Sequence, residues 1–206
     1  MIIIGEMDLT FTSGSGTFFC PTCRTSRAFV QKKVRRFLTL YFIPVIPLHV
    51  VSEQVICQGC RGKFPVEAVN FTEEMYRELA RREFAEDVRR VMVLTMLADD
   101  QASPQEIGTL RSVYRQLAGR ELSDEEIERD IFMARKTKVS AASYARTVAN
   151  RRSMDEREWL VRAAFLVASA EGALTEERLQ QLKLLPVALG IPEDRFRQII
   201  EEASRY

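Results

Sequence analysis

The sequence predicts an α+β protein with two domains: a small β domain built around four cysteines, then an all-α bundle of about seven helices. Two observations predict this order. All four cysteines and the single histidine lie before residue 64, among β-branched and aromatic residues. Beyond residue 70 Glu, Arg, Ala and Leu dominate, and apolar residues recur at helical spacing. We therefore expect a β domain over residues 1–70 and a helical domain over residues 71–206.

Charge is distributed unevenly between these two parts. The whole chain has a net charge of +1. Residues 1–70 contain eight basic and four acidic side chains, which gives +4, and the remainder is −3. The small total argues against a protein that binds nucleic acid along its whole surface, although the first domain is mildly basic.

The chain lacks the sequence features of export and of membrane insertion. Its first residues, "MIIIGEMD", contain no basic start and only a short apolar run. The longest apolar run, Phe37 to Val51, contains two prolines and is shorter than the roughly 20 residues that a bilayer requires. We expect a cytoplasmic protein, in a reducing compartment where paired thiols more often bind metal than form disulfides.

The four cysteines form two pairs with the same spacing, Cys20 with Cys23 and Cys57 with Cys60. Each C-x-x-C turn can present two thiolates to one ion, and two such turns complete the tetrahedral site that zinc prefers. The pattern predicts a structural zinc ribbon. A thioredoxin-like redox pair is the alternative, although it expects a single motif in a βαβ context. His49 could replace one ligand, but its position favours a packed or surface residue.

The segment between the two cysteine pairs predicts a hairpin. Residues 28–45 alternate and are rich in β-branched and aromatic side chains, which favours a strand, a turn near Pro44 or Pro47, and a return strand over residues 49–56. The earlier "SGSG" at residues 13–16 lacks the lysine of a phosphate-binding loop, so we expect a flexible turn there.

Four basic residues lie close together within this hairpin: Lys32, Lys33, Arg35 and Arg36. Zinc ribbons often contact nucleic acid through basic strands with neighbouring aromatic residues, so these four are candidate nucleic-acid contacts. A strand with one solvated face shows the same alternation of charge, and the sequence favours that interpretation.

Four elements in this region, "MIIIG", "FFCPTC", "RRFLTLYFIPVIPL" and "VICQGC", together resemble a bacterial zinc-ribbon family. The resemblance covers residues 1 to about 65 and implies a short N-terminal strand and a structural zinc on the four cysteines. The chain departs from the family in one respect. Arg24 and Arg61 follow the second cysteine of each pair, where the family usually has glycine.

The helical domain shows repeated start and stop signals. Ser-x-x-Glu capping boxes begin at Ser103, Ser123 and Ser153, and Gly119 is a stop signal. One helix is expected to bury a face that includes Val88 and Met92. The expected helices cover residues 72–100, 103–118, 123–136, 139–150, 153–172, 175–190 and 192–206.

This domain contains a divergent internal repeat, because residues 97–107 and 169–179 each join an apolar helix to an acidic, capped one. The repeat is similar to the tellurite-resistance TerB family and to the N-terminal domain of DjlA-type membrane co-chaperones. The resemblance implies an acidic, metal-binding corner, with Asp99, Asp100 and Glu106 as candidate ligands of a second divalent cation. Asp100 stands where the family has glycine. In the second copy Arg178 stands where the glutamate belongs, so that corner is expected to be inactive.

Physical reasoning leaves the role of this corner open. Carboxylates at a helix C-terminus lie in an unfavourable field unless a positive group is close, and a divalent cation would supply that charge. The N-terminus of the next helix would also supply it, and Glu106 already belongs to the capping box of Ser103. Capping alone is the favoured interpretation.

The sequence gives little material for catalysis, since the single histidine has no acidic neighbour in the chain. We expect a non-enzymatic, metal-binding adaptor of a tellurite-resistance or stress-response type, whose helical domain binds protein partners, among which a membrane-associated partner fits the DjlA resemblance. The alternative is a nucleic-acid-associated zinc ribbon whose helical domain recruits other proteins. A regulatory subunit of a larger enzyme is a third interpretation.

Overall fold

The computed structural model describes residues 4–172 and 174–205 of the 206-residue chain. It divides into two compact units, the first ending at Leu79 and the second beginning at Ala80. The first contains an antiparallel sheet and the second contains helices, which confirms the predicted fold class. We call them the β unit and the helical unit.

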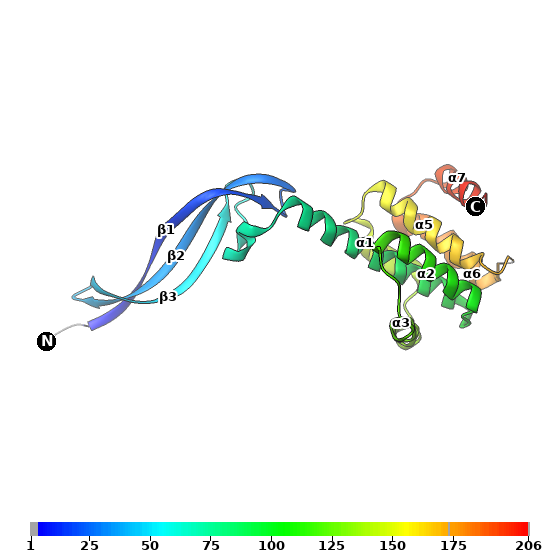
Figure 1. Cartoon of the computed structure of the whole chain (residues 1–206), viewed down its shortest axis with the longest axis horizontal. Helices are drawn as coiled ribbons and strands as arrows, with labels where there is room; N and C mark the ends of the chain where they lie inside the picture. The colour runs from blue at the N-terminus through cyan, green and yellow to red at the C-terminus, as the bar shows by residue number, and fades with distance from the viewer. Residues whose placement is uncertain (1–3, 173, 206) are drawn as a thin grey trace. The chain divides into compact units, whose positions relative to one another are not determined.

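The β unit is a curled sheet of four antiparallel strands in the order β1-β2-β3-β4 (Figure 1). Three strands are long and the fourth is short: β1 (Ile4–Cys20), β2 (Thr25–Leu40), β3 (Ile43–Cys57) and β4 (Lys63–Phe64). A 3-10 helix (Val66–Asn70) follows. β1 is therefore longer than the short N-terminal strand that the zinc-ribbon resemblance implies.

The turn between β2 and β3 differs from the prediction. It consists of Tyr41 and Phe42, and both predicted turn residues, Pro44 and Pro47, lie inside β3. The sequence cue was misleading because proline also fits an edge strand, where its missing N–H faces no partner. At this end of the sheet β3 is such an edge, since β4 pairs only with Val55 and Ile56.

The "SGSG" segment is also not the predicted turn. Residues 13–16 continue β1, with a bulge between Thr12 and Gly14. Gly16 lies opposite Phe29 on β2, and a Cβ atom at Gly16 would come within 3.0 Å of the Phe29 ring. Glycine therefore serves close packing at this position.

The core of the β unit is small. Its buried residues are Phe18, Cys20, Phe29, Val55 and Cys57. The Phe18 ring packs edge-on against Phe29, with 5.6 Å between the ring centroids. Two of the five core residues are cysteines, so apolar burial and the cysteine cluster hold the same end of the sheet.

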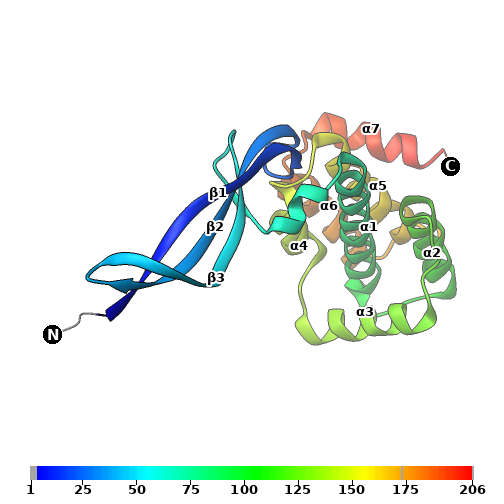
Figure 2. The same ribbon diagram turned by 60° about the vertical axis from the view of Figure 1, so that its left-hand side comes forward.

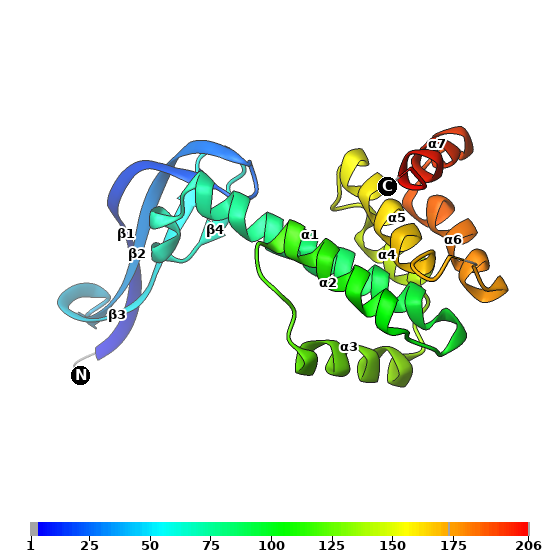
Figure 3. The same ribbon diagram turned by 45° about the vertical axis from the view of Figure 1, so that its right-hand side comes forward.

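Seven helices follow in the described part of the chain, most of them visible in Figure 2, and the first begins at Glu73, before the helical unit starts at Ala80. Their bounds are α1 (Glu73–Met96), α2 (Pro104–Ala118), α3 (Asp124–Thr137), α4 (Ala141–Ala149), α5 (Met154–Ala168), α6 (Glu176–Leu189) and α7 (Glu193–Ala203), with a 3-10 turn (Leu97–Asp99) after α1. Figures 2 and 3 both show extended segments that lead to the two ends of α3. No helix in the described part of the chain is both long enough and apolar enough to cross a bilayer.

The start and stop signals act as predicted. Complete capping boxes form at Ser103, Ser123 and Ser153, each with the glutamate three residues later. Gly119 and Gly190 end α2 and α6 with nearly identical left-handed φ angles of 70° and 69°. These are equivalent positions in the predicted internal repeat.

One continuous core fills the helical unit. The buried face of α1 includes Val88, Val91, Met92 and Met96, and it packs with Leu110, Leu160, Leu185 and Leu189 from α2, α5 and α6. Trp159 is partly buried against this core. The larger core indicates that the helical unit does not depend on a metal for its fold.

Candidate metal centre

Four sulfur atoms converge where the two C-x-x-C turns of the β unit meet. We call these turns, Cys20–Cys23 and Cys57–Cys60, the knuckles. The Sγ atoms of Cys20 and Cys60 are 3.7 Å apart, and those of Cys23 and Cys57 are 3.9 Å apart. All four lie within 4.8 Å of one another. A tetrahedral ion with four bonds of about 2.3 Å requires sulfur atoms about 3.8 Å apart. The cluster could therefore hold one metal ion, as the C-x-x-C spacing predicted.

The sheet supplies this geometry through two tight turns. The first pair lies between β1 and β2 and the second between β3 and β4, and the pairing of β2 with β3 places Phe29 opposite Cys57. In each turn the residue after the second cysteine donates its backbone N–H to the carbonyl of the first, from Arg24 to Cys20 at 2.8 Å and from Arg61 to Cys57 at 3.0 Å.

Arg24 and Arg61 adopt the left-handed conformation that glycine favours, with φ angles of 52° and 58°. The knuckle geometry is therefore kept although the glycines are replaced. The cost of a left-handed conformation in a residue with a Cβ atom, about 1–2 kcal/mol, must be offset by the rest of the turn.

The thiols have different acidities. Burial raises the pKa of Cys20 to about 12 and also raises the pKa of Cys23. Burial opposes ionisation of Cys57 as well, but backbone N–H groups of Cys60 and Gly59 outweigh it and lower its pKa to about 7. The Gly59 N–H lies 3.3 Å from the Cys57 sulfur. Only one of these three thiols ionises readily alone, so a bound cation would be needed to hold all four as thiolates.

A disulfide does not fit this arrangement as well as a shared ion. The sulfur–sulfur distances of 3.7 and 3.9 Å run from one knuckle to the other, and each is far longer than the roughly 2.05 Å of a disulfide bond. All four cysteines are unpaired. His49 is exposed on β3 and does not belong to the cluster.

The acidic corner of the helical unit has a different composition from the predicted cation site. Arg178 of α6 inserts its guanidinium between two of the predicted ligands. Its Nε lies 3.0 Å from Asp99 Oδ2, and its Nη2 lies 2.9 Å from Glu106 Oε1. Arg178 is 2% exposed and Glu106 is fully buried. The positive charge that the helix C-terminus and its acids require thus comes from the chain itself.

The third predicted ligand, Asp100, is exposed and takes the left-handed conformation of a helix C-cap, with φ at 61°. It therefore occupies the glycine position of the family pattern with the backbone shape of glycine. Glu106 Oε2 accepts the Ser103 N–H at 2.9 Å, as the capping interpretation expects. Within the described residues, the cysteines are the one His, Cys, Asp and Glu cluster with metal-ligand spacing.

The predicted nucleic-acid residues alternate along β2, so they are divided between the two faces of the sheet. Arg36 donates two hydrogen bonds to the Asp8 carboxylate, at 2.8 and 3.1 Å. Lys33 Nζ lies 2.5 Å from the Glu53 carboxylate. Arg36 thereby lowers the pKa of Asp8. Lys32 and Arg35 have no ion pair with any described residue. This distribution is that of a salt-bridged sheet more than of one basic face.

Sequence reasoning missed the ion pairs that hold the helical unit. Asp87 on α1 is buried and binds Arg152 through Oδ2 at 2.7 and 2.9 Å. The Tyr144 hydroxyl donates to the same carboxylate at 2.6 Å. An acid among the apolar residues of an otherwise buried helix face was the available signal. Its basic partner, 65 residues away, has no signal in the sequence.

A second missed feature is an apolar groove of about 530 Å³ between α1, α3 and α4. Val93, Leu94, Met133 and Val139 are among the residues that line it, and Arg129 lies with them. Phe132 next to Met133 is 63% exposed. The groove could receive apolar side chains of another protein.

Comparison with known proteins identifies one part of the chain. The family model described as tellurite resistance protein TerB matches residues 85–201, which is more than half of the sequence. This range lies inside the helical unit. No curated protein and no solved structure matches the chain.

Proposed function

The chain belongs to the TerB family of tellurite resistance proteins, and on this premise we propose that it is a non-enzymatic, zinc-binding adaptor of the tellurite-resistance or stress-response type. The zinc is structural and is held by Cys20, Cys23, Cys57 and Cys60. The helical unit binds a protein partner. The observation that carries the metal assignment is the cluster of four sulfur atoms with spacings of 3.7 and 3.9 Å.

Zinc is the metal that the donor set favours. Four thiolates at tetrahedral corners suit Zn²⁺ or an iron–sulfur centre, and the small, closed spacing of the sulfur atoms supports a single ion. A closed four-cysteine site leaves no position for a substrate, which supports a structural role. The exposed His49, outside the cluster, supports an adaptor without catalytic chemistry.

Partner binding by the helical unit is supported by the groove between α1, α3 and α4. Phe132 and Met133 of α3 are 63% and 48% exposed. Ile127 is the only buried residue of this helix, so most of its apolar side chains remain accessible to a partner. The charged residues that line the groove are Arg89, Arg90 and Arg129 with one acid, Asp130, so a partner with apolar side chains and acidic neighbours fits best. The nucleic-acid interpretation has less support, because two of its four residues already bind acids.

The metal assignment is tested by elemental analysis of the purified full chain. We expect one zinc per chain, and we expect Cys57→Ser to lose it. His49→Ser is the control, and its zinc content should equal that of the unchanged chain. Iron in place of zinc, or no metal at all, would contradict the assignment.

The adaptor assignment is tested by growth in tellurite of the organism that encodes the chain. Deleting the gene should lower tolerance, and Met133→Glu in the groove should lower it as well without changing zinc content or helicity. Met154→Glu is a matched control, because Met154 is also exposed, at 46%, but lies at the start of α5. Equal tolerance with and without the gene would contradict the proposed stress role.

A further inference from the structure

The end of the β2–β3 hairpin is an exposed apolar surface. We call residues 40–46 the hairpin tip. Its exposed apolar side chains include Phe42, Ile43, Val45 and Ile46, with exposed fractions of 72, 65, 56 and 51%. No charged residue occurs between Phe37 and Leu48. Contiguous exposed apolar surface of this kind indicates a site that contacts a membrane, a ligand or another protein.

The turn at the tip has a strained backbone. The two-residue turn has Tyr41 and Phe42 at φ angles of 50° and 66°. Such turns favour Asn-Gly, because bulky residues are strained in the left-handed conformation. Aromatic residues kept in a strained turn indicate that their side chains serve a purpose other than folding.

The edge of the sheet at the tip argues against strand addition by a protein partner or a second copy. Pro44 and Pro47 lie in β3, which is the edge strand there. Neither has a backbone N–H to donate to an added strand, and edge prolines are a common means of blocking such pairing. The tip is therefore better suited to an apolar phase than to a new strand.

The charges behind the tip are those that an anionic surface would attract. Arg36 lies four residues from Leu40, which is about 13 Å along a strand. The two nearby acids, Glu6 and Asp8, are both paired with Arg36. Lys32 and Arg35 have no acidic partner among the described residues. Over residues 4–64 eight basic side chains face three acidic ones, a net charge of +5 with the thiols neutral.

These observations point to one occupant. We propose that the hairpin tip inserts into the boundary between headgroups and acyl chains of an anionic lipid membrane. Phe42, Ile43 and Val45 enter the apolar layer, while Arg35, five residues before Leu40 on β2, and Lys32 behind it stay outside the layer and attract the anionic headgroups. Interfacial segments penetrate about 5–10 Å, so the uncharged length of the tip suffices. The protein is held at the surface and does not span the bilayer.

The experiment is co-sedimentation of the full, zinc-loaded chain with lipid vesicles. We expect binding to phosphatidylcholine vesicles that contain phosphatidylglycerol, and weaker binding to phosphatidylcholine alone, because the basic residues add to apolar insertion. Phe42→Asp should reduce binding about tenfold or more. Val187→Asp, an equally drastic change at a site on α6 that is 78% exposed, should leave it unchanged.

A second variant separates insertion from folding. Phe42→Gly relieves the left-handed strain of the turn and should raise the Tm of the β unit, yet it removes the aromatic ring and should lower vesicle binding. If the Phe42 ring served only the fold, vesicle binding would not fall while the Tm rises. In Phe42→Trp, tryptophan emission should shift to shorter wavelength on addition of anionic vesicles, after subtraction of the Trp159 signal from the unchanged chain.

Three results would overturn the proposal: no sedimentation with anionic vesicles, equal sedimentation of Phe42→Asp and the unchanged chain, or no spectral shift in Phe42→Trp. A concentration-dependent dimer that Phe42→Asp dissociates, in a chain that binds no vesicles, would assign the tip to a second copy instead. Loss of zinc in any variant is checked separately, so failure of the tip proposal leaves the metal assignment untouched.

Discussion

Arg178 is the residue that most changes the interpretation of the helical unit. In the pattern of the internal repeat it stands where a glutamate belongs, and in the fold it reaches Glu106, its counterpart in the first copy. The two residues of the repeat thus pair with each other in the core. An internal guanidinium takes the position where the family resemblance implied a cation near Asp99 and Glu106.

Replacing Arg178 by alanine should lower the free energy of unfolding of the helical unit by about 3–5 kcal/mol, because Glu106 would remain buried without a positive partner. Urea unfolding followed by far-ultraviolet circular dichroism measures this change. Arg197→Ala is the control, since its partner Glu193 is 80% exposed and solvent already screens that pair. Equal losses in the two variants would show that burial of Glu106 has no special cost.

The two knuckle arginines permit a prediction in the opposite direction. Arg24→Gly should stabilise the zinc-loaded β unit by about 1 kcal/mol, because glycine reaches a φ of 52° without steric cost. Zinc released to a coloured chelator during urea unfolding gives the measurement. Arg27→Gly, inside β2, should destabilise instead, since glycine weakens a strand. A loss of stability in Arg24→Gly would mean that the arginine side chain contributes more than the backbone strain costs.

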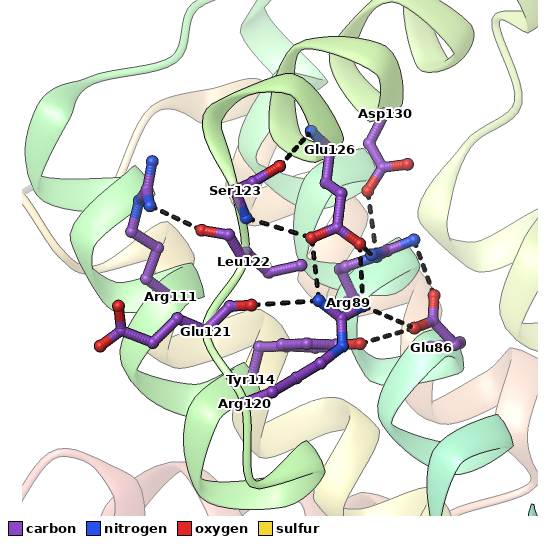
Figure 4. Close-up of polar contacts among 10 residues, drawn as sticks. All are labelled: Glu86, Arg89, Arg111, Tyr114, Arg120, Glu121, Leu122, Ser123, Glu126 and Asp130. Carbon is purple, nitrogen blue, oxygen red and sulfur yellow. Dashed lines mark hydrogen bonds and ion pairs between the residues drawn. The ribbon is translucent and has the colours of Figure 1, made fainter.

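Among the elements, α3 is held by charge more than by apolar packing. Ile127 is its only buried residue. Figure 4 shows the contacts that join it to α1 and to the segment before α3. Arg89 on α1 binds Glu86 at 2.7 Å and Asp130 at 3.0 Å, and Glu126 accepts from Arg120 at 2.8 and 2.9 Å. Glu126 is thus both a capping residue and an ion-pair partner.

The pairing of Glu126 predicts how α3 responds to acid. Arg120 and the Ser123 N–H lower the pKa of Glu126 from its ordinary value of 4.5 to about 2. A carboxyl with a lowered pKa stabilises the folded state above pH 4.5, and this contribution is lost as the pH falls through about 2. Glu126→Gln should therefore speed amide hydrogen exchange in α3 at pH 7, relative to the unchanged chain.

The difference between Glu126→Gln and the unchanged chain should shrink between pH 4.5 and pH 2, as the carboxyl of the unchanged chain becomes protonated. Glu201→Gln is the control, because Glu201 is exposed on α7. A difference that stays constant across this pH range would show that the charge of Glu126 does not hold α3.

At the scale of the whole molecule, the two units differ in what stabilises them. The β unit has a core of five buried residues that includes two of the four cysteines. The helical unit has a continuous core to which all seven described helices and the loops between them contribute. A structural zinc contributes on the order of 10 kcal/mol to folding in small zinc modules. The zinc that we propose for the four cysteines would therefore decide whether the first unit folds, whereas the larger core of the second unit does not require it.

Removing the metal should therefore unfold one unit and spare the other. With a strong chelator, amide signals of residues in β1–β3 should lose their dispersion in a nuclear magnetic resonance spectrum, while those of α2 and α5 stay in place. Cys57→Ser should reproduce this pattern without chelator, and His49→Ser should not. Simultaneous loss of both sets of signals would contradict separate stabilisation of the two units.

The sequence alone determined the fold class, the capping boxes and the two C-x-x-C turns, because these depend on local spacing. A C-x-x-C turn, a Ser-x-x-Glu start and a Gly stop each act within a few residues. The family pattern also marked positions 100 and 178 as unusual. What the local pattern could not supply was the partner of each unusual residue.

Only the tertiary structure decided the rest, and the reason is distance along the chain. Arg178 meets Asp99 across 79 residues, and Arg152 meets Asp87 across 65. The turn at Tyr41 and Phe42 also escaped local reasoning, since the prolines after it fit an edge strand equally well. Charge pairs and edges arise when elements pack together, so they appear only once the packing is known.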